Sequence, residues 1–183
     1  MKILGIDPGL RKTGWGLVVW KNNSFSYIND GFFFQNDKLE IGQKLLRIFD
    51  CLSLLIKKTK PDLIGIEQTF VGSGNVSSLK LGMARGICIL TAAKLGVKIL
   101  EIQPKLVKKN ITGTGVATKD QVNLMIKNIL NIVPKSEDSS DALAVAMSIQ
   151  SKSIGKLDNG EYSSKLDQAI ANALKKEKVN MQK

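Results

Sequence analysis

Two short apolar runs, each ending in an acidic residue, most limit what this chain can fold into. Residues 3–6 are followed by Asp7, and residues 63–66 are followed by Glu67. Apolar runs of this length, bounded by turn residues, indicate buried β-strands. A carboxylate at the end of a buried strand is costly unless a positive group neutralises it. The pattern predicts an α/β sheet with acids at its strand ends, where open α/β sheets place their ligands.

The rest of the chain alternates between strand and helix patterns. Strands are expected at residues 3–7, 15–20, 24–28 and 31–34, with a turn at residues 29–31, and again at residues 63–67 and 97–102. Helices are expected at residues 41–56, 75–94, 118–130 and 139–151, and Thr118 with Gln121 matches a capping box. This order predicts one mixed sheet with an antiparallel front and parallel crossovers behind.

The charge balance favours an anionic partner. The chain has 27 Lys and Arg against 16 Asp and Glu, a formal net charge of +11, which favours nucleic acid over a membrane. A basic surface that serves only solubility is the alternative. The chain has no histidine, which excludes Ser-His-Asp and Cys-His catalysis and a histidine-ligated zinc. Cys51 and Cys88 form no CxxC pair and indicate a cytoplasmic protein, and no apolar run approaches the roughly 20 residues of a membrane span.

Two further acids, Asp138 and Asp141, open an Ala-rich stretch three residues apart, so a helix places them on one face. From that face they can reach the strand ends that carry Asp7 and Glu67. Converging carboxylates can hold two hard cations ~4 Å apart, which activate water and stabilise the leaving oxygen of a phosphodiester. Structural alternatives exist: Asp7 as a turn former, and Asp138 or Ser139 as a helix cap. In that case Asp141 adds only a favourable interaction with the helix dipole. Glu67 is harder to explain structurally, because a lone Glu after four apolar residues has no capping role.

Several residues outside this set are candidates for contact with a nucleic acid. Lys105, Lys108 and Lys109 precede a Gly-Thr-Gly turn and form a basic segment that attracts phosphates, although a solvated helix face has the same pattern. Phe70 stands at the head of a glycine-rich loop, where it either stacks on an unpaired base or packs under the loop. Arg85 either binds a phosphate or faces solvent.

Four ordered motifs make the chain recognisable. They are GIDPG at residues 5–9, IEQTF at residues 66–70, LKLGMARG at residues 79–86 and DSSDALA at residues 138–144. Together they closely resemble the RuvC family of bacterial Holliday junction resolvases over residues 1–151. The resemblance implies a ribonuclease H-like nuclease domain over residues 1–151, with a five-stranded mixed sheet flanked by helices. Residues 152–183 form a basic C-terminal tail outside the resemblance, expected to be partly disordered or helical.

The resemblance also carries over site residues. Lys108 and Lys119 match family lysines near the scissile phosphate, where Lys119 is expected to stabilise developing charge. Phe70 matches the aromatic that the family places beside the junction strands. Some relatives carry a histidine at position 138, whereas this site is all carboxylate. The metal-binding catalytic acids are then Asp7, Glu67, Asp138 and Asp141, and the expected DNA contacts are Phe70, Arg85, Lys105, Lys108, Lys109 and Lys119.

The predicted function is a structure-selective endodeoxyribonuclease of DNA recombination and repair. The resemblance implies a homodimer that resolves four-way junctions by symmetric paired nicks through metal-activated water, leaving 5′-phosphate and 3′-hydroxyl ends. It implies two Mg²⁺ ions per active site, with Mn²⁺ as an alternative, and RuvA and RuvB as branch-migration partners. The helix from residue 77 to 94 is the candidate dimer interface, its apolar side chains being Leu79, Met83, Ile87, Leu90 and Thr91; packing against the sheet is the alternative.

Two other functions compete with this one. The segment Asp7-Pro8-Gly9 with Thr13-Gly14 faintly resembles the first phosphate loop of actin-like ATPases, which need two such domains; tight ATP binding identifies such a protein. A non-catalytic junction-binding module, with purely structural acids, shows no metal-dependent nicking.

Overall fold

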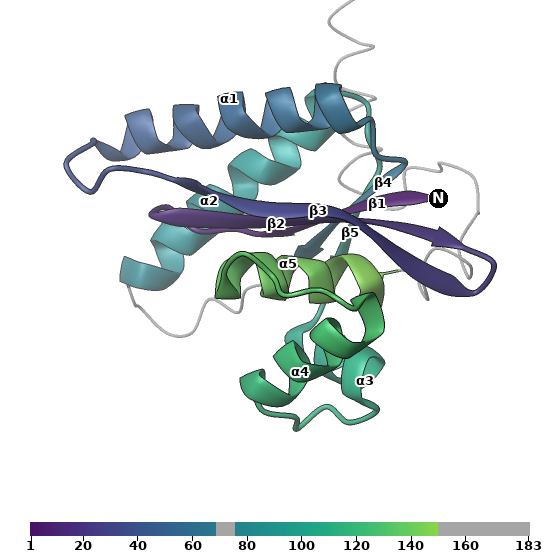
Figure 1. Ribbon diagram of the computed structural model, residues 1–183. Helices are drawn as coiled ribbons and strands as arrows, with labels where there is room; N and C mark the ends of the chain where they lie inside the picture. The colour runs from purple at the N-terminus through teal and green to yellow at the C-terminus, as the bar shows by residue number, and fades with distance from the viewer. Residues whose placement is uncertain (69–75, 150–183) are drawn as a thin grey trace, which may run out of the picture. The chain divides into compact units, whose positions relative to one another are not determined.

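A five-stranded mixed sheet lies at the centre of the fold (Figure 1). The structure, a computed structural model, describes residues 1–68 and 76–149. The strand order is β3-β2-β1-β4-β5, with β1–β2 and β2–β3 antiparallel and β1–β4 and β4–β5 parallel. This confirms the predicted antiparallel front and parallel crossovers. The strands are β1 (Lys2–Asp7), β2 (Lys12–Lys21), β3 (Ser24–Phe34), β4 (Leu63–Glu67) and β5 (Ile99–Ile102).

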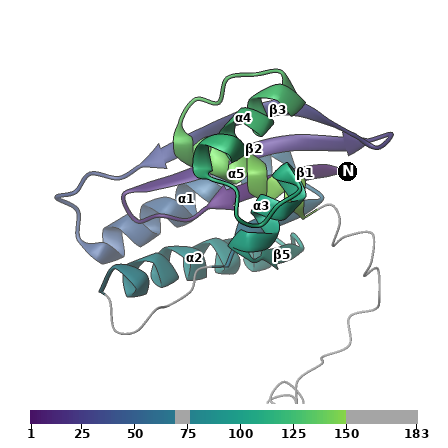
Figure 2. The same ribbon diagram turned by 90° about the horizontal axis from the view of Figure 1, so that it is seen from below.

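Helices cover both faces of the sheet. α1 (Ile41–Thr59) and α2 (Val76–Lys94) lie on one face, and α5 (Glu137–Ser148) lies on the other (Figure 1). α3 (Pro104–Thr112) and α4 (Lys119–Leu130) pack against α5 on the side away from the sheet, as the view from below shows (Figure 2). Because strand side chains alternate between faces, β1 sends Leu4 and Ile6 toward α1 and α2, and Ile3 toward the core around α5.

Glycines let α5 lie directly on the strands. A Cβ at Gly5 of β1 would overlap the carbonyl oxygen of Ala142, and one at Gly14 of β2 would overlap the carbonyl oxygen of Asp138. No larger residue leaves room for this approach. The close contact brings the first turns of α5, which carry Asp138 and Asp141, down to the edge of the sheet where β1 ends.

Three local predictions need correction. Residues 29–31 form no turn: β3 is continuous, and the hairpin turn lies at Asn22 and Asn23, both with positive φ. The last helix begins at residue 137 rather than 139, because Ser136 caps it and accepts a hydrogen bond from the backbone N–H of Ser139. A further helix, α3, begins at Pro104, which suits a first helical position because it lacks an N–H. The capping box of Thr118 and Gln121 is confirmed.

The expectation of no membrane-length apolar segment also needs a correction. By length and composition alone, α2 could cross a membrane. Its buried residues, Ala84, Cys88, Thr91 and Ala92, instead belong to the core between α2, α1 and the sheet. Buried residues make up 22% of that window, and Val76, Leu79, Met83 and Leu90 are exposed. The predictions for Phe70, for residues 150–151 of the last helix and for the tail at residues 152–183 lie outside the described residues.

Candidate active site

Asp7 and Glu67 lie side by side at the carboxyl ends of parallel strands. Ile6 of β1 pairs with Ile66 of β4, so the following acids are neighbours. By alternation, both side chains share the sheet face of Gly5 and Gly65, which α5 covers. The position of each acid directly after its strand, together with this parallel register, explains why the two acids are neighbours.

Asp7 is the most strongly perturbed of the site carboxyls. Burial, followed by the negative charges of Asp141, Glu67 and Asp138, raises the pKa of Asp7 from 3.8 to about 7, and Lys119 opposes the effect only in part. All three other acids thus lie close enough to act on Asp7. A carboxyl held against three like charges is a site that favours a cation.

Glu67 and Asp141 line one hollow of about 280 Å³, together with Lys108 and Lys119. Burial, followed by the charge on Asp141, raises the pKa of Glu67. Burial also raises the pKa of Asp141, against the opposing hydrogen bond and charge of Lys119. The Nζ of Lys119 lies 3.0 Å from Oδ2 of Asp141 and 3.4 Å from Oε2 of Glu137, and these contacts raise the pKa of Lys119.

Asp138 belongs to a neighbouring hollow. It forms an ion pair with Lys12 and lines a space of about 570 Å³ with Arg11, Lys12 and Phe34. The Nζ of Lys12 also lies 4.2 Å from the centroid of the Phe32 ring, a cation–π geometry. Asp138 therefore lines a different hollow from Glu67 and Asp141, although its charge still acts on Asp7. Asp138 opens onto a second space beside the first.

Lys12 is a residue of the site that was not predicted from the sequence. A signal was present: alternation along residues 12–21 places Lys12 on the same face as Gly14 and Gly16, the face that α5 covers. A lysine at the end of that row, one strand from Asp7, is placed to contact the helix that carries Asp138.

Only some of the residues predicted to contact DNA lie beside the acids. Lys108 and Lys119 lie at the acids, whereas Lys105 and Lys109 are exposed on α3. The Nη2 of Arg85 lies 2.5 Å from Oε2 of Glu101 on β5, so its guanidinium is held by a carboxylate. Phe70 lies outside the described residues. Contacts of these residues with DNA stay predictions.

The donor set suits a hard divalent cation. All four acids offer only carboxylate oxygens, the ligands that Mg²⁺ prefers. Among residues 1–68 and 76–149, no three acidic or cysteine side chains converge closely enough to hold a metal ion as they stand. Lys12 and Lys119 take up an oxygen of Asp138 and of Asp141. Metal ligation by these two acids would therefore use their other carboxylate oxygen or displace the two lysine side chains.

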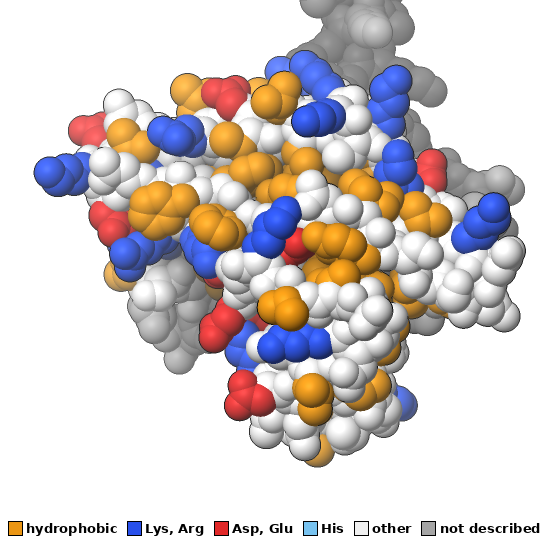
Figure 3. Space-filling view, viewed as in Figure 1, with side chains coloured by type: hydrophobic (Ala, Val, Ile, Leu, Met, Phe, Trp, Pro, Cys, Tyr) orange, Lys and Arg blue, Asp and Glu red, His pale blue; other side chains and the backbone are white. Residues whose placement is uncertain are grey.

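Surface charge by itself does not single out this site. On the face seen in Figure 3, Lys and Arg side chains are spread from the α1 end to the α4 end, with acidic and hydrophobic side chains between them. The position of the four acids therefore carries more information than the net charge.

Comparison with known proteins adds independent findings. The family profile described as "Crossover junction endodeoxyribonuclease RuvC" matches residues 3–149. A protein of that description from Rhodopseudomonas palustris (strain BisA53) is 42% identical over 148 residues, which cover 80% of this chain and 85% of that protein. One from Rhizobium johnstonii is 38% identical over 148 residues, covering 80% and 88%. The structure of Thermus thermophilus RuvC in complex with Holliday junction substrate superimposes with a TM-score of 0.79 at 26% identity, over 85% of this chain and 96% of that one.

Proposed function

The chain belongs to the RuvC family of crossover junction endodeoxyribonucleases and resolves Holliday junctions in recombination and repair; from this premise we propose how its own residues perform the reaction. The observation that carries the proposal is that the acids of β4 and α5 all raise the pKa of Asp7, at the end of β1. Mutual repulsion of this kind is relieved when divalent cations bind.

The acids are proposed to hold two Mg²⁺ ions, with Mn²⁺ as an alternative. Asp7, whose pKa the other three acids raise, would hold the ions together with Glu67, Asp138 and Asp141. Bound Mg²⁺ supplies Lewis acidity toward the phosphate and lowers the pKa of water. The rigid strand ends contribute by holding Asp7 and Glu67 in register before the substrate arrives.

The lysines are proposed to change partners during the reaction cycle. In the structure, Lys12 and Lys119 neutralise Asp138 and Asp141, and Lys108 moderates the raised pKa of Glu67. With divalent cations bound, these acids would no longer depend on the lysines, and the three ammonium groups would be able to face a phosphate. Lys119 is proposed to stabilise negative charge that develops on the scissile phosphate. Lys12 and the exposed Phe34 would contact the neighbouring nucleotide from the second hollow.

Paired cutting requires two sites, which we assign to a homodimer formed through α2. An exposed apolar stripe follows this helix and continues a period of three or four residues. Thr91, predicted to be part of it, is buried in the core instead. A two-fold dimer presents two equivalent sites to two symmetric strands, giving paired nicks with 5′-phosphate and 3′-hydroxyl ends. The exposed apolar side chains are Val76, Leu79, Met83 and Leu90.

The wider setting is also a proposal. A nuclease domain at residues 1–151 acting on bacterial chromosomal DNA would work in the cytoplasm, with RuvA and RuvB as its branch-migration partners. The tail at residues 152–183 would add basic charge outside that domain. Family membership and the DNA substrate support this placement.

One assay tests the catalytic proposal. A labelled four-way junction is incubated with wild type, Asp7→Asn or the exposed-residue control Asp50→Asn, with and without Mg²⁺, beside a linear duplex. We expect Mg²⁺-dependent paired nicks of the junction by wild type and the control, and binding without cleavage by Asp7→Asn. Normal cutting by Asp7→Asn, or cutting by wild type in EDTA, would contradict the assigned role of the acids.

A further inference from the structure

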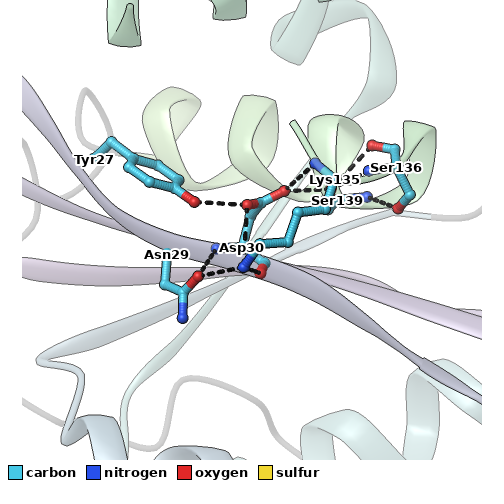
Figure 4. Close-up of polar contacts among 6 residues, drawn as sticks. All are labelled: Tyr27, Asn29, Asp30, Lys135, Ser136 and Ser139. Carbon is cyan, nitrogen blue, oxygen red and sulfur yellow. Dashed lines mark hydrogen bonds and ion pairs between the residues drawn. The ribbon is translucent and has the colours of Figure 1, made fainter. Parts of the chain in front are cut away.

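Asp30 is a buried acid that the proposed reaction does not use. It lies on the edge strand β3, and its side chain is 0% exposed. Its carboxylate accepts hydrogen bonds from the hydroxyl of Tyr27 at 2.7 Å, the hydroxyl of Ser139 at 2.6 Å and the backbone N–H of Lys135 at 2.8 Å (Figure 4). Burying a carboxylate is costly unless hydrogen bonds compensate for the lost water, as these three donors do here. Two of the donors belong to α5 and to the residue just before its N-cap, so the carboxylate links β3 to this helix.

A β-bulge makes this arrangement possible. β2 and β3 pair as Val18 with Tyr27 and then as Leu17 with Asn29, so Ile28 is an extra residue. In a regular strand, positions three apart point to opposite faces. The bulge reverses the alternation, so Tyr27 and Asp30 share the face that α5 covers, whereas Ile28 and Asn29 are both exposed. The bulge lies directly beside residues 29–31, where a turn was predicted.

The bonds of Asp30 hold both sides of the α5 N-cap. One oxygen, Oδ2, accepts from the backbone N–H of Lys135, just before the capping residue Ser136, and from Oγ of Ser139, three residues after it. The Ser139 hydroxyl also accepts from the backbone N–H of Ser136 at 3.0 Å, and Ser136 Oγ accepts from the N–H of Ser139 at 3.1 Å. The Nζ of Lys135 bonds to the backbone oxygen of Asp30 at 2.9 Å and to Oδ1 of Asn29 at 2.6 Å. The capping box of α5 is thus bonded to β3 as a unit.

This attachment adds a polar restraint on the rotation of α5 about its own axis. Gly5 and Gly14 determine how closely the helix approaches the sheet, and the packing of the buried side chains of α5 limits its rotation together with these bonds. Ser139 lies between Asp138 and Asp141, so a bond that holds its hydroxyl restrains the part of α5 that carries both carboxylates. A rotation of roughly 20° moves a group ~5 Å from a helix axis by about 2 Å, far beyond the tolerance of about 0.2 Å in metal–ligand distances.

We propose that Asp30 is a positioning residue: through Ser139 and the Lys135 backbone it orients α5 so that Asp138 and Asp141 face the ends of β1 and β4. Asp30 contacts neither DNA nor the reacting atoms. This inference rests on the proposed metal site, and it concerns how this chain builds that site from a strand more than a hundred residues away.

The test measures metal binding by the DNA-free protein. Activity alone would not distinguish a misplaced α5 from a loss of folding. Asp30→Asn removes the charge and half of the acceptor capacity. Ser139→Ala removes the bond between Asp30 and α5, together with the bonds of that hydroxyl to Ser136, but leaves Asp30 bonded to Tyr27 and Lys135. Mn²⁺ affinity is measured by titration calorimetry, and the Mg²⁺ concentration for half-maximal junction cleavage is measured in parallel. We expect each variant to bind Mn²⁺ about 10-fold or more weakly, with kcat restored toward wild type at saturating metal and KM for the junction unchanged.

A matched control separates positioning from general loss of stability. Leu52→Val thins the core under α1, on the opposite face of the sheet, so it lowers the melting temperature without touching α5. It should bind Mn²⁺ as wild type does. The double variant of Asp30→Asn and Ser139→Ala should lose less Mn²⁺ affinity than the sum of the two single losses, because both changes break the bond between Asp30 and Ser139.

The outcomes are distinguishable. If Asp30→Asn does not fold, Ser139→Ala decides by itself. Wild-type Mn²⁺ affinity in both variants, with only a lower melting temperature, would make Asp30 purely structural and overturn the inference. Absence of Mn²⁺ binding by wild type would instead overturn the proposed metal site.

Discussion

Replacing Asp7 by asparagine should stabilise the metal-free protein while abolishing cleavage. The side chain keeps its shape and loses the charge that burial and three acids oppose. Raising a carboxyl pKa from 3.8 to about 7 corresponds to about 4 kcal/mol at 1.36 kcal/mol per pH unit. Asp7 retains some contact with solvent, which screens part of this energy, so we expect a gain of about 2–4 kcal/mol.

The gain must follow pH in a defined direction. Between pH 3.8 and about 7, the folded protein holds a proton on Asp7 that the unfolded chain has released. The stability of wild type therefore falls as pH rises through this window, and the full penalty applies above pH 7. Asp7→Asn lacks the penalty, so its advantage should be absent below pH 3.8 and complete near pH 8.

Thermal unfolding in EDTA, followed by circular dichroism from pH 4 to 8.5, provides the measurement. For a domain of this size, 2–4 kcal/mol corresponds to roughly 5–15 °C in melting temperature. Asp50→Asn, at an exposed position of α1, should leave the melting temperature nearly unchanged. Adding Mg²⁺ should stabilise wild type far more than Asp7→Asn. A variant that melts at or below wild type at pH 8, or whose advantage does not change with pH, would refute the electrostatic reasoning.

Four further predictions concern other parts of the molecule. Gly5→Ala should lower stability by several kcal/mol, because the new Cβ overlaps the backbone of Ala142; chemical denaturation measures the loss, and a neutral effect would mean that α5 can lift off the sheet freely. Lys12→Met should bind Mn²⁺ more tightly in calorimetry, because it frees a carboxylate, yet bind junction DNA several-fold more weakly in gel-shift assays; equal values for both would remove Lys12 from the site. Leu90→Glu should elute as a monomer in size-exclusion chromatography and lose paired cutting, whereas an unchanged dimer would place the interface elsewhere. Burial pushes the pKa of Asp30 upward, but hydrogen bonds from its neighbours outweigh it and hold the pKa below 3.8, so its contribution to stability, present above pH 3.8, should be lost on further acidification in wild type and absent from Asp30→Asn.

The local elements could be predicted because their signals are local. Apolar runs ending in Asp7 and Glu67 predicted two strands, and the capping box at Thr118 predicted the start of α4, as observed. Once both acids follow parallel strands, the pairing of Ile6 with Ile66 makes them neighbours. Their meeting was therefore implicit in the amino-acid order, because hydrogen-bond geometry leaves few alternatives to parallel strand ends.

What the tertiary structure decided lies in contacts between distant segments. Residues 29–31 have turn composition, yet the buried bonds of Asp30 to Ser139 and Lys135 outweigh that local preference and keep β3 continuous. The ion pair of Lys12 with Asp138 likewise depends on α5 resting on two glycines. Composition and periodicity specify which residues are buried. The register of a bulged strand and the rotation of a helix are set by side-chain bonds across the fold, which no local pattern encodes.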